Sequence, residues 1–213
     1  MKSIDRREAL VGGLLGTAAI LGLDLAVRPD AAAQTVGVPA PAFTLPASNG
    51  RTVSLADFKG KTVVLEWSNH ECPYVGKHYR SSNMQKLQKK WTARDVVWLT
   101  VISSAPGLQG HVTAEQANKL TTERGAAPSA VLLDPKGAVG RAYGARVTPH
   151  MFVIAGDGML IYAGGIDDKP SANIEDLKTA RNYADDVLTA ISDGKPVAVA
   201  RTRAYGCTVK YGS

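Results

Sequence analysis

One stretch of this 213-residue chain constrains its fold more than any other: an apolar run that turns into a cysteine-proline step. Thr62 to Trp67 is rich in β-branched and apolar residues and predicts a buried strand, while the lysine-rich pattern from Tyr74 predicts a helix. Proline fits the first helical turn, because its missing N–H would have no helical partner there. Cys72 is therefore expected at a helix start, where free N–H groups and the helix dipole favour a thiolate.

The first thirty-odd residues are predicted to be an export signal. A short polar segment ends in Arg6-Arg7, an apolar segment follows at 9–23, and small residues end at Ala33. This pattern resembles a twin-arginine signal. The apolar segment is short for a membrane span, although an uncleaved anchor or an ordinary secretory signal would be alternatives. We expect removal of residues 1–33, a periplasmic or otherwise exported protein, and no stable membrane anchor after cleavage.

The remainder has the length of one domain, predicted at 34–195, followed by a tail at 196–213 that contains Cys207. The net charge is +6, but the basic residues are scattered, so we expect no nucleic-acid partner. Cys72 and Cys207 are the only cysteines of the chain. Two cysteines cannot form a disulfide scaffold, but they can form one redox pair in an oxidising compartment.

The order of predicted elements indicates an α/β fold with a mixed central sheet, flanking helices and an N-terminal hairpin. The hairpin turns at Asn49-Gly50. The predicted strands are 62–67, 96–102, 131–133, 151–154 and 160–163, and the predicted helices are 74–93, 113–124, 137–143 and 173–192. The tail is β-prone at 196–200. Pro149 stands at the start of a strand, where a missing N–H is tolerated and a cis peptide bond occurs.

A cysteine after the first central strand, combined with a proline that opens a later one, resembles the thioredoxin fold. The run Cys72-Pro73-Tyr74-Val75 after Trp67, the run from Tyr143 to Pro149 and Gly156-Asp157-Gly158 resemble peroxiredoxin-like redoxins of the alkyl hydroperoxide reductase and thiol-specific antioxidant (AhpC/TSA) superfamily. The resemblance implies a three-layer α/β sandwich without a bound cofactor. It also implies that Cys72 is the nucleophile, that Pro149 is a cis-proline, and that Thr148 lies against Cys72.

Three positions depart from the patterns of related groups. Val75 stands where thioredoxins have their second cysteine, and Gly76 where copper-delivering relatives have theirs. Asn69 replaces the threonine that peroxiredoxins have three residues before the peroxidatic cysteine. Attack by Cys72 on a disulfide or a peroxide gives a mixed disulfide or a sulfenic acid, and both need a second thiol. Cys207 is the internal candidate for this resolving role.

We therefore predict an exported thiol-dependent oxidoreductase that reduces peroxides or protein disulfides and is recharged by an external thiol reductant. Lys77, His70 and His78 are candidate positive groups that would assist the thiolate. Two alternatives remain: a copper or zinc module using Cys72, Cys207 and a histidine such as His150, and a redox-inert interaction domain. The prediction assigns no metal ligand.

Overall fold

The structure, a computed structural model, describes residues 35–212, so the predicted signal segment lies outside the described residues. The elements follow in chain order: β1 (Val38–Pro39), β2 (Thr44–Pro46), β3 (Thr52–Ser54), η1 (Leu55–Phe58), β4 (Val63–Trp67), α1 (Pro73–Arg80), α2 (Asn83–Thr92), β5 (Val97–Ile102), α3 (Ala114–Glu123), β6 (Ala130–Leu133), α4 (Ala138–Ala142), β7 (Val147–Thr148), β8 (His150–Ile154), β9 (Met159–Gly164), η2 (Ile174–Lys178), α5 (Tyr183–Ser192) and β10 (Cys207–Thr208). No helix among these residues is long and apolar enough to cross a membrane.

A six-stranded mixed sheet forms the centre of the molecule, with the order β1-β9-β8-β4-β5-β6. β4, β5 and β6 run parallel, whereas β8 and β9 run antiparallel to their neighbours. β4 lies inside the sheet and all five of its residues are buried, which explains its nearly continuous apolar sequence. The predicted mixed sheet is confirmed.

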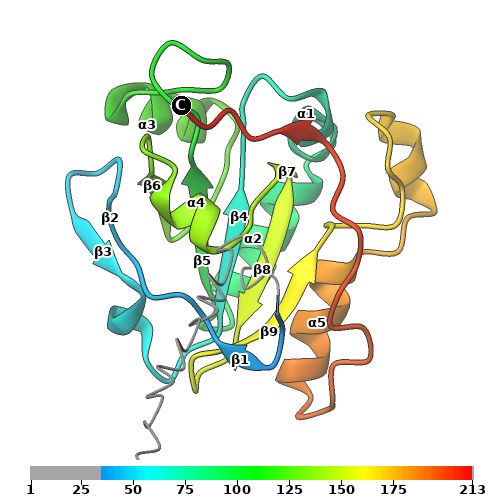
Figure 1. Ribbon diagram of the computed structural model, residues 1–213. Helices are drawn as coiled ribbons and strands as arrows, with labels where there is room; N and C mark the ends of the chain where they lie inside the picture. The colour runs from blue at the N-terminus through cyan, green and yellow to red at the C-terminus, as the bar shows by residue number, and fades with distance from the viewer. Residues whose placement is uncertain (1–34, 213) are drawn as a thin grey trace, which may run out of the picture.

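The sheet lies between two layers, as expected for the predicted three-layer sandwich (Figure 1). On one face, Leu65 and Trp67 pack with residues of the β2–β3 hairpin and with Tyr143, which follows α4. On the other face, Val64 packs with residues of α1, α2 and α5. The alternation of side chains along a strand produces this division, because successive residues point to opposite faces.

Two predicted helices are each divided in the structure. The helix predicted at 74–93 consists of α1 and α2, because Ser82 adopts a left-handed conformation (φ 61°) and the Ser81 hydroxyl donates to the Lys77 carbonyl (2.7 Å). Such local side-chain bonds compete with helical ones. The helix predicted at 173–192 consists of η2 and α5, and α5 begins afresh at Asn182, whose side chain accepts from the Asp185 N–H.

The ends of the described chain also differ from expectation. The β-prone segment 196–200 forms no strand; its last carbonyl, that of Ala200, accepts one hydrogen bond from the Ala163 N–H at the edge of β9 (3.1 Å). Three short strands that the sequence did not indicate are present instead, β1, β7 and β10: β1 pairs with β9, and β10 pairs with β7. Such short pairings leave no periodic pattern in a sequence.

A buried carboxylate ties β4 to its neighbours. Glu66 is fully buried and accepts hydrogen bonds from four side chains on α1, α2 and β5: Tyr79 (2.9 Å), Gln88 (3.1 Å), Trp98 (2.9 Å) and Thr100 (3.3 Å). Burial is the largest influence on its pKa and raises it, while the four hydrogen bonds act in the opposite direction. Glu66 therefore holds the helix that begins at Cys72 against the central strand.

Candidate functional site: two cysteines at one end of the sheet

Cys72 lies between β4 and α1, at the N-cap of the helix, and Pro73 occupies the first helical position. The loop 68–72 begins with a hydrogen bond from the Ser68 N–H to the Val101 carbonyl (3.0 Å). The cysteine side chain is only 1% exposed, and its thiol donates a hydrogen bond to the Thr148 carbonyl (3.1 Å). The predicted position at a helix start is therefore found, but the thiol is covered.

Thr148 and Pro149 lie at the same end of the sheet as Cys72. The peptide bond between them is cis. Pro149 directly precedes β8, and the first residue of that strand, His150, pairs with Trp67 at the end of β4. This register brings the Thr148 carbonyl to the cysteine loop.

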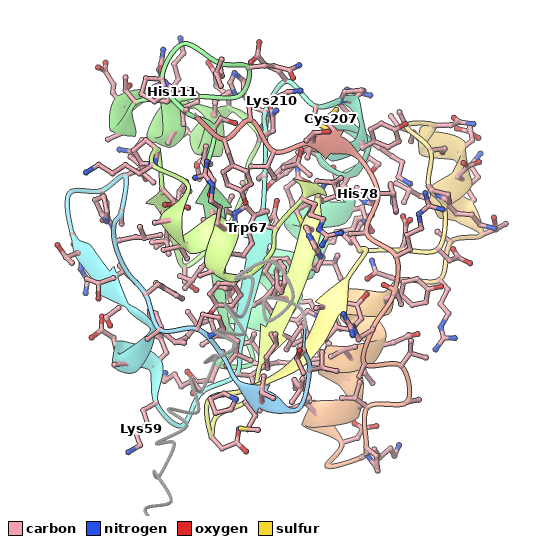
Figure 2. The ribbon with its side chains drawn as sticks, viewed as in Figure 1. Lys59, Trp67, His78, His111, Cys207 and Lys210 are labelled. Carbon is pink, nitrogen blue, oxygen red and sulfur yellow. The ribbon has the colours of Figure 1, made fainter. Side chains whose placement is uncertain are left out.

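Cys207 is brought to Cys72 by the C-terminal tail. β10 pairs antiparallel with β7, with Cys207 opposite Thr148, and the Thr148 hydroxyl donates to the Cys207 carbonyl (3.4 Å). The Cys207 thiol lies close enough to the Cys72 sulfur to lower the pKa of Cys72. Figure 2 shows Cys207 on the tail, beside the beginning of α1. Two cysteines that are far apart in the sequence thus lie close together, and no disulfide joins them in this structure.

Gly206 permits the close approach of the tail to Thr148. A Cβ atom at this position would lie 1.9 Å from the Thr148 oxygen, and the glycine has φ +136°, a value that other residues rarely adopt. Glycine is therefore required at position 206, because the Thr148 oxygen leaves no room for a side chain.

Upstream of Cys207, the tail is held by a buried charged network. Tyr205 donates a short hydrogen bond to Asp167 and accepts one from the Lys77 ammonium (3.1 Å). The Lys77 ammonium also lies 3.2 Å from the Asp167 carboxylate, and the side chains of both residues are at most 1% exposed. Because Lys77 is on α1 and Tyr205 is two residues before Cys207, this network joins the helix of one cysteine to the tail of the other.

Downstream of Cys207, backbone bonds and one tyrosine fix the tail on the opposite side of the site. The Val209 N–H donates to the Arg146 carbonyl (2.9 Å), and the Lys210 carbonyl accepts from the Ala105 N–H (2.9 Å). Tyr211 donates to the Ala145 carbonyl (2.6 Å) and packs against Gly140, where a Cβ atom would lie 2.4 Å from the tyrosine hydroxyl. The segment carrying Cys207 is therefore attached on both sides.

The environment makes the two thiols unequal. Burial is the largest influence on Cys72 and raises its pKa, but hydrogen bonds to the sulfur lower the pKa overall; they come from the Cys207 thiol, the Thr148 hydroxyl and the N–H groups of Val75 and Cys207. For Cys207, burial and then the neighbouring Cys72 sulfur raise the pKa to about 12. Cys72 is thus the thiol that ionises first.

The expected cationic assistance to Cys72 is not found. Lys77 is directed at Asp167 and at the Lys169 carbonyl (2.9 Å) instead. Burial lowers the pKa of His78 to about 4 and lowers that of His70 below its usual value, so both imidazoles are neutral near pH 7. The structure therefore corrects this expectation: hydrogen bonds, rather than neighbouring cations, stabilise the thiolate.

Two further sequence candidates can be located. Asn69 is buried; its oxygen accepts from the Glu71 N–H (2.9 Å), while its amide nitrogen has no partner among the described residues. His150 is also buried, and burial lowers its pKa to about 3. Residues 35–212 contain no group of three or more histidine, cysteine, aspartate or glutamate side chains that could hold a metal ion. Cys72, Cys207 and His150 therefore do not form such a group.

The sequence did not reveal how the pair of cysteines is supported: Lys77 was a candidate for another role, and Asp167 and Tyr205 were not indicated. Lys77, Asp167 and Tyr205 come from three distant segments, and no local pattern links them. Gly206 was visible beside Cys207, but its reason became apparent only from the contact with Thr148.

Comparison with known proteins places the chain among redoxins. The model of the Redoxin family matches residues 35–181. A hypothetical protein from Sinorhizobium meliloti has a similar structure, with a TM-score of 0.70 and 23% identity over 84% of this chain and 96% of that one. An uncharacterized conserved protein from Geobacillus kaustophilus has a TM-score of 0.70 and 24% identity over 84% of this chain and 93% of that one. The thioredoxin domain of a thiol-disulfide oxidoreductase from Bacteroides vulgatus has a TM-score of 0.50 and 20% identity over 68% of this chain and 96% of that one. No curated protein matches.

We predict that Lys77→Met destabilises the protein by about 3–5 kcal/mol, because it leaves the Asp167 carboxylate buried without its cation. Urea unfolding measures the loss. Lys178→Met is the control, since Lys178 pairs with Glu175 on the exposed surface, and we expect a loss of about 1 kcal/mol or less. Equal losses in the two variants would contradict the assigned role of Lys77.

We also predict that the thiols of the reduced protein titrate in two separate steps. The ultraviolet absorbance of the thiolate should show Cys72 ionising with a lowered pKa, while Cys207 ionises with a pKa of about 12. Cys207→Ala removes a donor to the Cys72 sulfur and should raise the first pKa relative to Cys207→Ser, which keeps a hydroxyl donor. Identical first steps in these two variants would contradict the hydrogen-bond explanation.

Proposed function

Since the chain belongs to the Redoxin family, we propose that it is a thiol-disulfide oxidoreductase that cycles between a Cys72–Cys207 dithiol and the corresponding disulfide. Family membership supports a thiol-dependent redox reaction. The observation that carries the proposal is the position of Cys207: the β7–β10 pairing holds it opposite Thr148, whose carbonyl accepts the hydrogen bond of the Cys72 thiol. Val75 and Gly76 stand where related proteins have a second cysteine, so Cys72 has no thiol partner on its own helix. The tail supplies this thiol as Cys207.

Cys72 is the nucleophile of this cycle and Cys207 its resolving partner. The Cys72 thiolate attacks one sulfur of a substrate disulfide, forms a mixed disulfide and releases the other sulfur as a thiolate. Cys207 then gives up its proton and attacks the Cys72 sulfur, which releases the second substrate thiolate and leaves the Cys72–Cys207 disulfide. The lowered pKa of Cys72 and the raised pKa of Cys207 support this division of roles. Two external thiols restore the dithiol.

Disulfides fit the site better than peroxides. Position 69 holds an asparagine, so the site lacks the hydroxyl that peroxiredoxins have at this position to orient a peroxide. The Thr148 carbonyl beside Cys72 accepts hydrogen bonds and cannot donate one to a peroxide oxygen. We therefore propose disulfide exchange as the main reaction, with an external thiol as reductant and no bound cofactor.

We further propose that the protein acts after export. The pair Arg6-Arg7, the apolar segment at 9–23 and the small residues before Gln34 support a twin-arginine type of signal. An oxidising compartment such as the periplasm suits a cycle that passes through an internal disulfide, because cytosolic reductants do not reach it.

Oxidised glutathione provides a direct test. The reduced wild-type protein should form the Cys72–Cys207 disulfide and release two glutathione molecules, as peptide mass spectrometry would show. Cys207→Ser should accumulate glutathione on Cys72, whereas Cys72→Ser should react more slowly, because burial still raises the pKa of the remaining thiol. Faster reaction of Cys72→Ser than of Cys207→Ser would contradict the assignment of Cys72 as the nucleophile. If hydrogen peroxide oxidises the protein and oxidised glutathione does not, the result would favour a peroxidase.

Gly206→Ala should slow closure of the internal disulfide, because the added Cβ atom cannot fit against the Thr148 oxygen. The mixed disulfide on Cys72 should consequently persist longer in this variant than in the wild type. Gly194→Ala is the control: Gly194 also has a positive φ (+66°), but nothing lies within 4 Å of an added Cβ atom. Equal closure rates in the two variants would contradict the role of the close approach.

A further inference from the structure

The part of the tail that carries Cys207 also covers Cys72. The Cys72 side chain is 1% exposed, and its thiol donates to the carbonyl of Thr148, the residue opposite which Cys207 is paired. The reaction proposed above requires a substrate sulfur to come into contact with Cys72. Because Cys207 occupies the neighbouring place on β7, this part of the tail must leave β7 before a substrate can enter.

Gly206 is the pivot about which the 206–212 segment can turn. It directly follows Tyr205, which the buried network with Lys77 and Asp167 holds in place. Glycine lacks the Cβ atom that restricts the backbone of other residues, so its φ and ψ angles can change at little steric cost. The segment can thus turn away from β7 while the network that joins the tail to α1 stays intact.

The contacts that hold the 206–212 segment on the molecule are local. They include the two-residue pairing of β10 with β7, the backbone bonds of Val209 and Lys210, and the hydrogen bond from the Tyr211 hydroxyl to the Ala145 carbonyl (2.6 Å). Water replaces such bonds when they open, so their net contribution to stability is modest. Short segments held in this way open without unfolding of the whole domain.

The edge of β7 that becomes free can bind another extended segment. A strand that loses its neighbour presents N–H and carbonyl groups to which a new strand can pair. A substrate strand in the register of β10 places its cysteine opposite Thr148 and therefore beside Cys72. The residue before that cysteine then takes the place of Gly206, where a Cβ atom would lie 1.9 Å from the Thr148 oxygen. This edge therefore favours glycine before the substrate cysteine.

We propose that the protein acts on extended polypeptide segments in which glycine precedes the reacting cysteine, and that the 206–212 segment leaves β7 to admit them. The inference rests on the proposed function, because it specifies the substrate of the Cys72 reaction. The Cys72 thiolate bonds to the substrate cysteine, and the other substrate sulfur leaves as a thiolate. The 206–212 segment then returns and displaces the substrate strand. Cys207 gives its proton to water and attacks the Cys72 sulfur, and the substrate cysteine leaves as a thiolate.

The substrate strand and the 206–212 segment exclude one another from β7, and this exclusion gives the cycle a direction. In the reduced protein the segment can leave, so a substrate can enter. Once Cys207 is bonded to Cys72, the disulfide ties the segment to the start of α1, and the free edge is no longer formed. Closure of the internal disulfide therefore also releases the reduced substrate.

The preference for glycine can be measured on the first step alone. In the full-length Cys207→Ser variant the mixed disulfide on Cys72 cannot be resolved, so its formation can be timed. Two peptides with blocked ends carry their cysteine as a disulfide with thionitrobenzoate: alanine-glycine-cysteine-threonine-valine, and the same peptide with valine in place of glycine. We expect the glycine peptide to release thionitrobenzoate about tenfold faster, because the valine side chain does not fit against the Thr148 oxygen.

Reaction of the same two peptides with free glutathione gives their intrinsic reactivities and serves as the control. If the rates on Cys72 are equal after this correction, or higher for the valine peptide, the inference is overturned and the proposed function stands. If Cys72 reacts with neither peptide and also not with oxidised glutathione, the proposed function itself is overturned.

The departure of the 206–212 segment has an independent test. Tyr211→Phe removes a hydrogen bond that holds the segment, so in the Cys207→Ser protein it should speed the reaction of Cys72 with dithiodipyridine about fivefold. Tyr143→Phe is the matched control, because its hydroxyl also donates to a backbone carbonyl, that of Pro41 (2.7 Å), but outside this segment. Equal acceleration in both variants would assign the exposure of Cys72 to unfolding of the whole domain. That result, or no acceleration by Tyr211→Phe, overturns the inference.

Discussion

The pairing of β10 with β7 is the contact on which the site depends. It places Cys207 opposite Thr148, whose carbonyl accepts the hydrogen bond of the Cys72 thiol. A free edge of this kind is a template for another extended strand. Here the tail of the same chain occupies it, so the second thiol arrives in a fixed register. Gly206 shows how close the fit is, since any side chain there would strike the Thr148 oxygen.

The buried network of Lys77, Asp167 and Tyr205 gives this pairing its rigidity. Burying an ammonium and a carboxylate is costly unless each is paired, and a buried ion pair adds little net stability compared with an apolar contact. Its effect here is one of position: it fixes the rotation of α1 relative to the tail. The helix that begins at Cys72 and the strand that begins at Cys207 are thereby joined by a contact that does not involve either sulfur.

The fold could be inferred from the sequence because its central strands are apolar runs. The apolar run before Cys72 and the turn at Asn49-Gly50 gave the central strand and the hairpin correctly. The divided helices could not be inferred, because their breaks depend on the backbone at Ser82 and Asn182. The positions of Cys72 and Pro149 followed from local rules, but the meeting of Cys72 with Cys207 depends on contacts between distant segments. Lys77 was misjudged because proximity in sequence does not show where a side chain points.

The distance between the cysteines in sequence gives this pair a property that a local dithiol lacks. A disulfide restricts the unfolded chain more when it closes a longer loop, and for a loop on the order of 100 residues the chain-entropy model gives about 4.7 kcal/mol. A disulfide between Cys72 and Cys207 would enclose most of the sheet and α5. By thermodynamic linkage, whatever holds the tail in place also favours oxidation, and oxidation favours the docked tail. The Tyr205 and Tyr211 contacts therefore act on the redox equilibrium as well as on the fold.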